Sequence, residues 1–296
     1  MLTSTATQAM TSASSRTAAL RVNNLSFAYG DVEVLHDISF EAYPGELIAV
    51  VGPNGVGKST LFKSLLGFNS HYTGTIELQG SDIKSMSSRQ RAKSIAYIPQ
   101  ASAQTFNYSV LELVVMGASP HLGVFEQPSP QDSEHALQIL DELGIAHLAY
   151  RGCSNISGGE YQLMLLARAL MQNATVLVMD EPTANLDYGN QYRVMQRIAG
   201  LARRDFVVIF SAHDPNQVLL NATRSLVLEK GRIIADGTPE QVLTEQLLSR
   251  LYRIDVHRHS VQEQDGTVRV CVPVGLEPKG IQEQQYAETE EVRHAD

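Results

Sequence analysis

The sequence has no apolar run long enough to form a membrane-spanning helix. Such a helix needs about 18 or more consecutive apolar residues, whereas the best stretches here, such as Leu47 to Val51, are only as long as a β-strand. The first residues also lack the apolar segment of a secretory signal peptide. We therefore predict that the chain does not cross a bilayer by itself.

Positive charge and cysteine are also scarce. The chain carries 23 Lys and Arg against 32 Asp and Glu, which gives a formal net charge of -9. This balance argues against nucleic acid as the main partner, because phosphate contacts need concentrated Lys and Arg. The two cysteines, Cys153 and Cys271, are far apart in the sequence and lack the spacing of metal ligands. We expect free thiols in a reducing cytoplasm.

Both ends of the chain lack hydrophobic periodicity. Residues 1–18 are rich in Ser, Thr and Ala, and residues 277–296 are polar and acidic, so we expect both segments to be disordered. The part between them is long enough and apolar enough for one large α/β domain. We place this domain at residues 19–255 and assign residues 256–276 to a short C-terminal extension.

Strand-like and helix-like segments alternate along this domain. The patterns predict strands at 19–29, 32–42, 46–51, 74–79, 94–98, 175–179 and 206–210, and a hairpin at 225–236. They predict helices at 58–66, 111–116, 133–143, 160–170 and 190–201, and a final helix capped by Thr238. The alternation indicates a mostly parallel core sheet, with an N-terminal antiparallel β-subdomain and a helical subdomain inserted at about residues 101–155.

A glycine-rich segment follows the predicted strand 46–51 and opens the next helix. Its residues are Gly52-Pro53-Asn54-Gly55-Val56-Gly57-Lys58-Ser59, which match the phosphate-loop pattern G-x-x-x-x-G-K-[ST]. The glycines let backbone N–H groups surround phosphate oxygens, and the helix N-terminus adds a partial positive charge. Lys58 is expected to reach the β- and γ-phosphates and Ser59 to coordinate Mg²⁺. The motif alone predicts only nucleoside triphosphate binding; a glycine-rich turn without a ligand is the plain alternative.

A second motif carries two acids at the end of a buried strand. The segment Thr175-Val176-Leu177-Val178-Met179-Asp180-Glu181 is apolar up to its last two residues. A strand ending beside a phosphate loop can present Asp180 to Mg²⁺, and Glu181 can orient and deprotonate the attacking water. Solvated acids at a strand end are common, so the motif indicates hydrolysis only in combination with the phosphate loop.

Residues 156–160 add a more specific motif. The segment Ile156-Ser157-Gly158-Gly159-Glu160 resembles the L-S-G-G-Q signature of the ATP-binding cassette (ABC) family and lies just upstream of the second acidic motif, as it does in that family. The resemblance covers about residues 19–255. It implies a P-loop NTPase cassette that binds ATP and Mg²⁺ and hydrolyses ATP as a head-to-tail pair with a second copy.

The resemblance also assigns roles to single residues. Glu181, His213 and Gln100 are implied to be catalytic, and Ser59, Gln100 and Asp180 to hold the metal. Tyr29 matches the aromatic residue that stacks on adenine, and Asp187 lies in the loop that crosses to the partner cassette. The implied nucleotide contacts are Tyr29, Gly52, Pro53, Asn54, Gly55, Val56, Gly57, Lys58, Ser59, Thr60, Asp180 and Asp187, with Ser157, Gly158, Gly159 and Glu160 acting on the ATP of the partner. Glu160 departs from the usual glutamine, and we expect it to tune the site without abolishing hydrolysis.

Two stretches suggest which transporters this cassette resembles. Residues 115–123 and 185–191 resemble those of cassettes that serve iron-siderophore, haem and cobalamin importers, a group that also includes some molybdate systems. An importer implies polytopic membrane permease subunits as partners and, indirectly, a periplasmic or extracellular substrate-binding protein. The cassette itself would be peripheral, at the cytoplasmic face of the membrane, and we favour an iron-siderophore substrate.

Other classes of ABC protein fit less well. DNA-repair ATPases of this family usually place a long coiled coil between the phosphate loop and the signature, and the gap here has no heptads. Translation-associated members usually carry two cassettes, whereas this chain has a single set of motifs. A purely regulatory nucleotide-binding module is disfavoured because Glu181 and His213 are both present. A non-transport ATPase acting on nucleic acid or ribosomes is the alternative.

Overall fold

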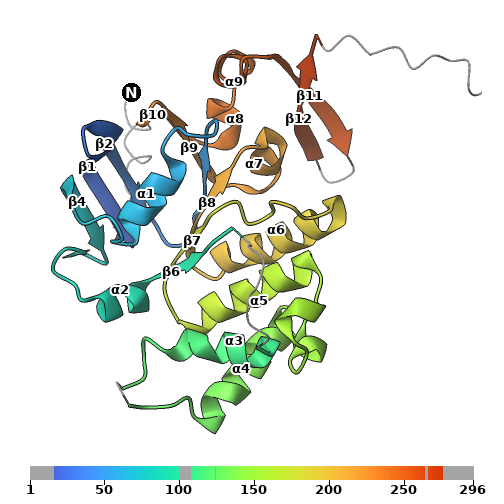
Figure 1. Cartoon of the computed structure of the whole chain (residues 1–296). Helices are drawn as coiled ribbons and strands as arrows, with labels where there is room; N and C mark the ends of the chain where they lie inside the picture. The colour runs from blue at the N-terminus through green and yellow to red at the C-terminus, as the bar shows by residue number, and fades with distance from the viewer. Residues whose placement is uncertain (1–16, 101–107, 124, 264–265, 276–296) are drawn as a thin grey trace, which may run out of the picture. The chain divides into compact units, whose positions relative to one another are not determined.

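The computed structural model describes residues 17–100, 108–123, 125–263 and 266–275 (Figure 1). Of the two segments predicted to be disordered, only Thr17 and Ala18 are among the described residues, and the whole of the tail 277–296 lies outside them. Residues 101–107 of the predicted helical subdomain also lie outside them. The chain divides into two compact units, one up to Val242 and one from Leu243. Among the described residues, no helix combines the length and the apolar character needed to span a membrane.

The first unit is built around a six-stranded sheet. Its strand order is β10-β9-β3-β8-β7-β6, and the strands from β9 to β6 run parallel, while β10 pairs antiparallel with β9. The bounds are β3 Leu47–Val51, β6 Ile95–Ile98, β7 Val176–Met179, β8 Val207–Ala212, β9 Arg224–Glu229 and β10 Arg232–Gly237. Every residue of β3, β7 and β8 is buried, which explains their continuous apolar sequences.

A second, antiparallel sheet comes from the N-terminal part of this unit. Its order is β2-β1-β4-β5, with β1 Leu20–Tyr29, β2 Val32–Ala42, β4 Tyr72–Leu78 and β5 Ser81–Asp82. Helix α1 (Lys58–Leu65) shares one hydrophobic core with both sheets through Leu61, Phe62 and Leu65. Because α1 follows the phosphate loop directly, this core fixes the loop at the carboxyl end of β3.

The remaining helices of the first unit begin at polar caps. Their bounds are α2 Ser88–Ser94, α3 Val110–Val115, α4 Pro130–Glu142, α5 Gly158–Met171, α6 Tyr188–Ala202, α7 Pro215–Asn221 and α8 Pro239–Val242, with short 3-10 turns η1 Met116–Ala118, η2 Ala146–Leu148 and η3 Cys153–Asn155. Helix α5 contacts α3 and α4 as well as α6 and β6 (Figure 1). It therefore connects the helical part of the unit to the six-stranded sheet.

The described part of the second unit forms a helix and a two-stranded hairpin. Helix α9 (Glu245–Tyr252) is followed by β11 (Asp255–Glu263) and β12 (Gly266–Val274), which pair antiparallel. The backbone N–H of Arg258 donates to Oε1 of Glu245 at 2.6 Å, and that of Val256 donates to Oγ of Ser249 at 3.0 Å. These bonds attach the hairpin to α9.

The predicted fold class is confirmed by this architecture. The first unit has the parallel core sheet, the antiparallel N-terminal sheet and the helices between β6 and β7 that the sequence indicates.

Candidate functional site

The phosphate loop connects β3 to α1 and depends on two of its glycines. Gly57 has φ +109° and is the N-cap of α1, a left-handed backbone that side chains rarely adopt. A Cβ added at Gly52 would lie only 2.4 Å from the backbone oxygen of Leu228. The loop therefore needs glycine at both positions, one for its backbone angle and one for its close approach to β9.

Lys58 lies inside this loop. Its side chain is 7% exposed, and Nζ donates to the backbone oxygens of Gly52 at 2.5 Å and Pro53 at 3.0 Å. Burial lowers the pKa of Lys58, whereas the carboxylates of Glu181 and Asp180 act in the opposite direction. The loop thus holds a largely buried cation, and its positive charge suits the binding of an anionic phosphate chain.

A cavity of about 170 Å³ lies over the loop and links it to the acidic motif. Its lining residues are Val34, Asn54, Gly55, Gly57, Lys58, Ser59, Thr60 and Glu181. The structure therefore brings the predicted phosphate-loop residues and Glu181 together around one space.

Asp180 is fixed by two hydroxyl groups from different elements. Ser59 Oγ, on α1, donates to Oδ2 of Asp180 at 3.1 Å, and Ser211 Oγ, on β8, donates to Oδ1 at 2.6 Å. The oxygens of Ser59 and Asp180 are hard donors of the kind that Mg²⁺ prefers. The residues at this point fit a magnesium ion, which Ser59 and Asp180 would hold.

Glu181 follows with a left-handed backbone, φ +45°. Its N–H donates to Ser211 Oγ at 2.8 Å, so one serine holds both acids of the motif. Gln100 Nε2 donates to Oε2 of Glu181 at 3.4 Å, and His213 Nδ1 lies 3.6 Å from Oε1. The Glu181 side chain is 21% exposed. All three predicted catalytic residues therefore meet at one carboxylate.

Sequence reasoning missed Ser211 and a chain of amides beside this carboxylate. Thr183 Oγ1 donates to Gln217, Gln217 donates to Gln191, and Gln191 donates to the backbone oxygen of Leu186, at 2.8, 2.9 and 3.0 Å. A polar serine in the otherwise apolar β8 was the available signal for Ser211. Gln191 and Gln217 lie on helices, and nothing in the sequence around them sets them apart from other polar helix residues.

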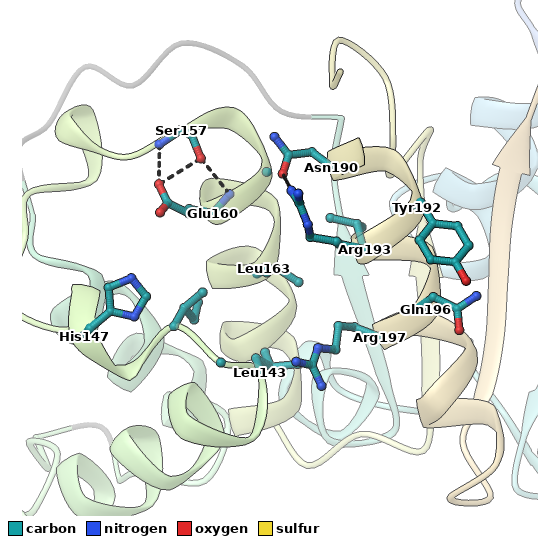
Figure 2. Close-up of a pocket in the computed structure, with 14 residues that line it drawn as sticks. Leu143, His147, Ser157, Glu160, Leu163, Asn190, Tyr192, Arg193, Gln196 and Arg197 are labelled. Carbon is teal, nitrogen blue, oxygen red and sulfur yellow. Dashed lines mark hydrogen bonds between the residues drawn. The ribbon is translucent and has the colours of Figure 1, made fainter. Parts of the chain in front are cut away.

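The residues of the signature motif lie at a different place. Ser157 caps α5: its Oγ accepts from the N–H of Glu160 at 3.4 Å, while its own N–H and Oγ donate to Oε2 of Glu160 at 2.7 and 2.8 Å (Figure 2). These bonds, and then His147 and Arg151 nearby, lower the pKa of Glu160. Glutamate at this position thus completes a capping box that keeps a negative charge at the start of α5.

Asp187 and Tyr29 also lie apart from the phosphate-loop cavity. Asp187 is the N-cap of α6 and accepts from the backbone N–H and from Nδ2 of Asn190 at 2.8 and 2.7 Å. Tyr29, at the end of β1, is 49% exposed and stacks edge-on against Phe27, with ring centroids 4.8 Å apart. Neither residue lines the cavity over the loop.

A phosphate loop after β3, paired acids after β7 and a capped signature helix together define a P-loop ATPase cassette. The chain belongs to the ABC transporter family, whose pattern matches residues 35–184, and it is an ATPase of the ABC type.

Several relatives of the chain are named for the substrate of their transporter. The chain is 38% identical over 242 residues to the hemin import ATP-binding protein HmuV of Pseudomonas entomophila, and the matched region covers 80% of this chain and 93% of the relative. It is 35% identical over 258 residues to the molybdate import ATP-binding protein MolC of Haemophilus influenzae, covering 86% and 96%. A solved structure described as a metal-chelate type ABC transporter, in an inward-facing conformation, has a TM-score of 0.78 and 34% identity, covering 88% of this chain and 98% of that one. The predicted resemblance is confirmed.

Proposed function

We propose that the chain is the ATP-binding and ATP-hydrolysing subunit of an ABC importer that takes up a metal-chelate substrate through a separate membrane permease. Similarity to proteins named for hemin and molybdate import, and to a metal-chelate type transporter, supports this proposal. Within that group we favour an iron-siderophore, with haem, cobalamin and molybdate as the other candidates.

The arrangement around Glu181 is the observation that carries the hydrolytic part of the proposal. The carboxylate lies beside the phosphate loop and is approached by Gln100 and by His213. In the proposed mechanism Glu181 orients and deprotonates the attacking water. Gln100 and His213 hold the carboxylate in place, and His213 contacts the γ-phosphate.

The phosphate loop supplies the binding part. We propose that Lys58 exchanges its bonds to the backbone oxygens of Gly52 and Pro53 for bonds to phosphate oxygens. Ser59 and Asp180 would hold Mg²⁺, with Gln100 as a further oxygen donor. The bound ion offsets negative charge on the phosphates.

The position of the signature motif supports a paired arrangement. Ser157 and Glu160 line a cavity that contains no phosphate-loop residue, so the capped start of α5 lies outside the phosphate-loop cavity of its own chain. A helix N-terminus attracts an anion. We propose that two cassettes face each other head to tail, with each ATP held by the phosphate loop of one chain and by Ser157, Gly158 and Gly159 of the other. ATP would then favour the closed pair because it binds that state better.

We also propose that the helical part of the first unit, around residues 101–155, transmits closure to the permease. The cassette would then be peripheral, at the cytoplasmic face of the membrane, and would meet the substrate-binding protein only through the permease.

Affinity purification of the tagged chain from solubilised membranes tests this assignment, with the tag alone as the control. We expect a polytopic permease to co-purify, and the purified complex to hydrolyse ATP. Recovery of ribosomes or nucleic acid, without a membrane protein, would overturn the transport role and favour the non-transport alternative. The identity of the permease then directs uptake measurements with an iron-siderophore, haem, cobalamin and molybdate.

A further inference from the structure

A groove between α5 and α6 is separate from the phosphate-loop site. It encloses about 580 Å³ and runs from the signature end of α5 to the loop after α4 (Figure 2). This volume is within the usual range of small-molecule sites, about 300–1,000 Å³. The groove is therefore large enough for a ligand of several carbon atoms.

The groove joins an apolar surface to two arginines. Leu143 and Ile145 line it from the segment after α4 and Leu163 from α5, while Arg193 and Arg197 project into it from α6 (Figure 2). Residues four apart lie on the same helix face, where two like charges repel. A bound anion would relieve that repulsion.

The two arginines differ in how they are paired. Arg193 Nη1 donates to Oδ1 of Asn190 at 2.7 Å. Arg197 forms no hydrogen bond or ion pair with any residue that the structure describes, although its Nη2 lies only 3.3 Å from where a Cβ at Gly144 would stand. The guanidinium thus lies beside the turn that follows α4, and its donors remain available. A guanidinium of this kind binds carboxylate, sulfonate or phosphate groups well.

Among the residues that line the groove the acid is Glu160, and its carboxylate accepts both bonds of the Ser157 cap at the signature end. The chain as a whole carries a net charge of -9. Two neighbouring positive charges that face a cavity therefore differ in sign from the net charge of the molecule. Charge complementarity therefore favours an anionic occupant at the arginine end.

Asn190 connects the groove to the residues of the proposed function. Its side chain donates to Asp187, accepts from Arg193, and lies so close to Gly159 that a Cβ there would stand 2.7 Å from Asn190 Cγ. An anion that engages Arg193 competes with Asn190 for its guanidinium. Such competition would loosen the Asp187 cap and the contact with Gly159.

We propose that this groove binds a small organic anion, with its charged group between Arg193 and Arg197 and its apolar body on Leu143, Ile145 and Leu163, and that binding slows ATP hydrolysis through Asn190. The binding step is independent of the proposed function; the effect on the rate rests on it, because it requires Gly159 and Asp187 to act on ATP.

The binding step is tested with the fluorescent probe anilinonaphthalene sulfonate, which has an aromatic body and one negative charge. We expect saturable binding to the wild-type chain. Arg197→Ala should weaken it by about tenfold, the loss typical of one charge-assisted hydrogen bond, and Leu163→Trp should weaken it by filling the groove. Arg203→Ala, an exposed arginine at the end of the same helix, is the matched control and should bind as the wild type does.

A second probe, phenylnaphthylamine, has the same kind of rings without the sulfonate and should bind at least tenfold more weakly, if the arginines recognise the charge. Equal affinity of the wild-type and Arg197→Ala chains for the sulfonate would overturn the proposal, as would equal affinity for the two probes.

The effect on hydrolysis is tested by measuring the ATPase rate across the same titration. We expect the wild-type rate to fall at least twofold as the groove fills, and the Arg197→Ala rate to change only at correspondingly higher probe concentration. An unchanged rate at saturation, or inhibition of both chains at the same concentration, would contradict the coupling. A wild-type chain that bound the probe but hydrolysed no ATP would instead contradict the proposed function and leave the binding site standing.

Discussion

At the scale of single residues, the Glu181 carboxylate can be separated from the groups that bind ATP. Lys58 and Ser59 belong to the phosphate loop, whereas Glu181 reaches the cavity from the end of β7. Replacing the carboxylate with an amide of the same size removes the proposed base and preserves the shape of the cavity. ATP binding and ATP hydrolysis should therefore respond differently to one substitution.

We predict that Glu181→Gln slows ATP hydrolysis by about 10²–10⁴-fold, the usual contribution of a general base, while the dissociation constant for ATP changes little. Steady-state turnover and equilibrium binding of a fluorescent ATP analogue measure the two effects. Glu134→Gln is the matched control, since Glu134 is exposed and forms no hydrogen bond or ion pair with any described residue. Wild-type turnover in Glu181→Gln would show that another group is the base.

Glu160 provides a pH-dependent test of the capped signature helix. Its pKa in the folded chain lies below the usual 4.5, first because its carboxylate accepts the backbone and side-chain bonds of Ser157. The folded state therefore releases this proton more readily than the unfolded state. The resulting stabilisation is present above the ordinary pKa and is lost as the pH falls through the lowered one.

We predict that Glu160→Gln lowers the free energy of unfolding at pH 7 by a few tenths of a kcal/mol, since the side chain is partly exposed and the glutamine retains one acceptor. The difference from the wild type should shrink as the pH falls through the lowered pKa of the carboxyl group. Urea denaturation at pH 7 and at a series of acidic pH values measures it. A difference that stayed constant with pH would mean that the charge of Glu160 does not stabilise the helix.

At the scale of secondary structure, Gly117 lets the turn η1 approach α5 closely. A Cβ at Gly117 would stand 2.2 Å from the backbone oxygen of Arg168 and 2.9 Å from Cβ of Met171. Backbone atoms cannot move away as a flexible side chain can. Any larger residue must therefore push the turn away from α5.

We predict that Gly117→Ala lowers the free energy of unfolding by about 1–3 kcal/mol, the typical cost of overpacking. The control is Gly200→Ala in α6, where the nearest atom to the new Cβ is Arg203 Nη2 at 3.8 Å. Alanine there should leave stability unchanged or raise it by up to about 1 kcal/mol. Chemical denaturation of the two variants measures both effects, and equal stabilities would contradict the close contact.

The sequence was a good guide to the elements whose patterns are local. The strand predicted at 32–42 matches β2, because a glycine turn and alternating apolar residues define it. Helix α4 begins at Pro130, three residues before the prediction, since Ser129 and Asp132 form a capping box and proline is favourable at the first helical position. The predicted final helix is divided into α8 and α9, because Thr244 forms a new N-cap.

Contacts between distant segments were harder to predict. No strands were predicted where β11 and β12 form a hairpin, although Asp265-Gly266 between two alternating runs is a recognised turn signal. Ser211 was missed at the site because its importance depends on β8 lying beside β7. The groove between α5 and α6 arises from packing and has no motif of its own.

At the scale of the whole molecule, the central question is whether one chain contains a complete ATP site. The phosphate-loop residues surround one cavity, whereas Ser157 and Glu160 line another that shares none of the phosphate-loop residues. In the proposed pair, the loop of a single chain therefore binds one ATP, and its signature helix contacts the ATP of the other chain. This separation predicts that nucleotide binding and pairing of chains can be uncoupled by a substitution at the signature.

We predict that Ser157→Arg abolishes ATP-dependent pairing while leaving ATP binding by the phosphate loop intact. Arginine removes the cap of α5 and places a bulky side chain where the γ-phosphate of the partner is proposed to lie, and one lost cap costs only about 1 kcal/mol of stability. Light scattering in the Glu181→Gln background, where ATP persists, should detect dimers for Glu181→Gln alone and monomers for the double variant. Ser154→Arg, three residues away and outside the cap, is the control and should still pair. Dimers of the Ser157→Arg double variant would mean that the signature helix does not close on the ATP of a second chain.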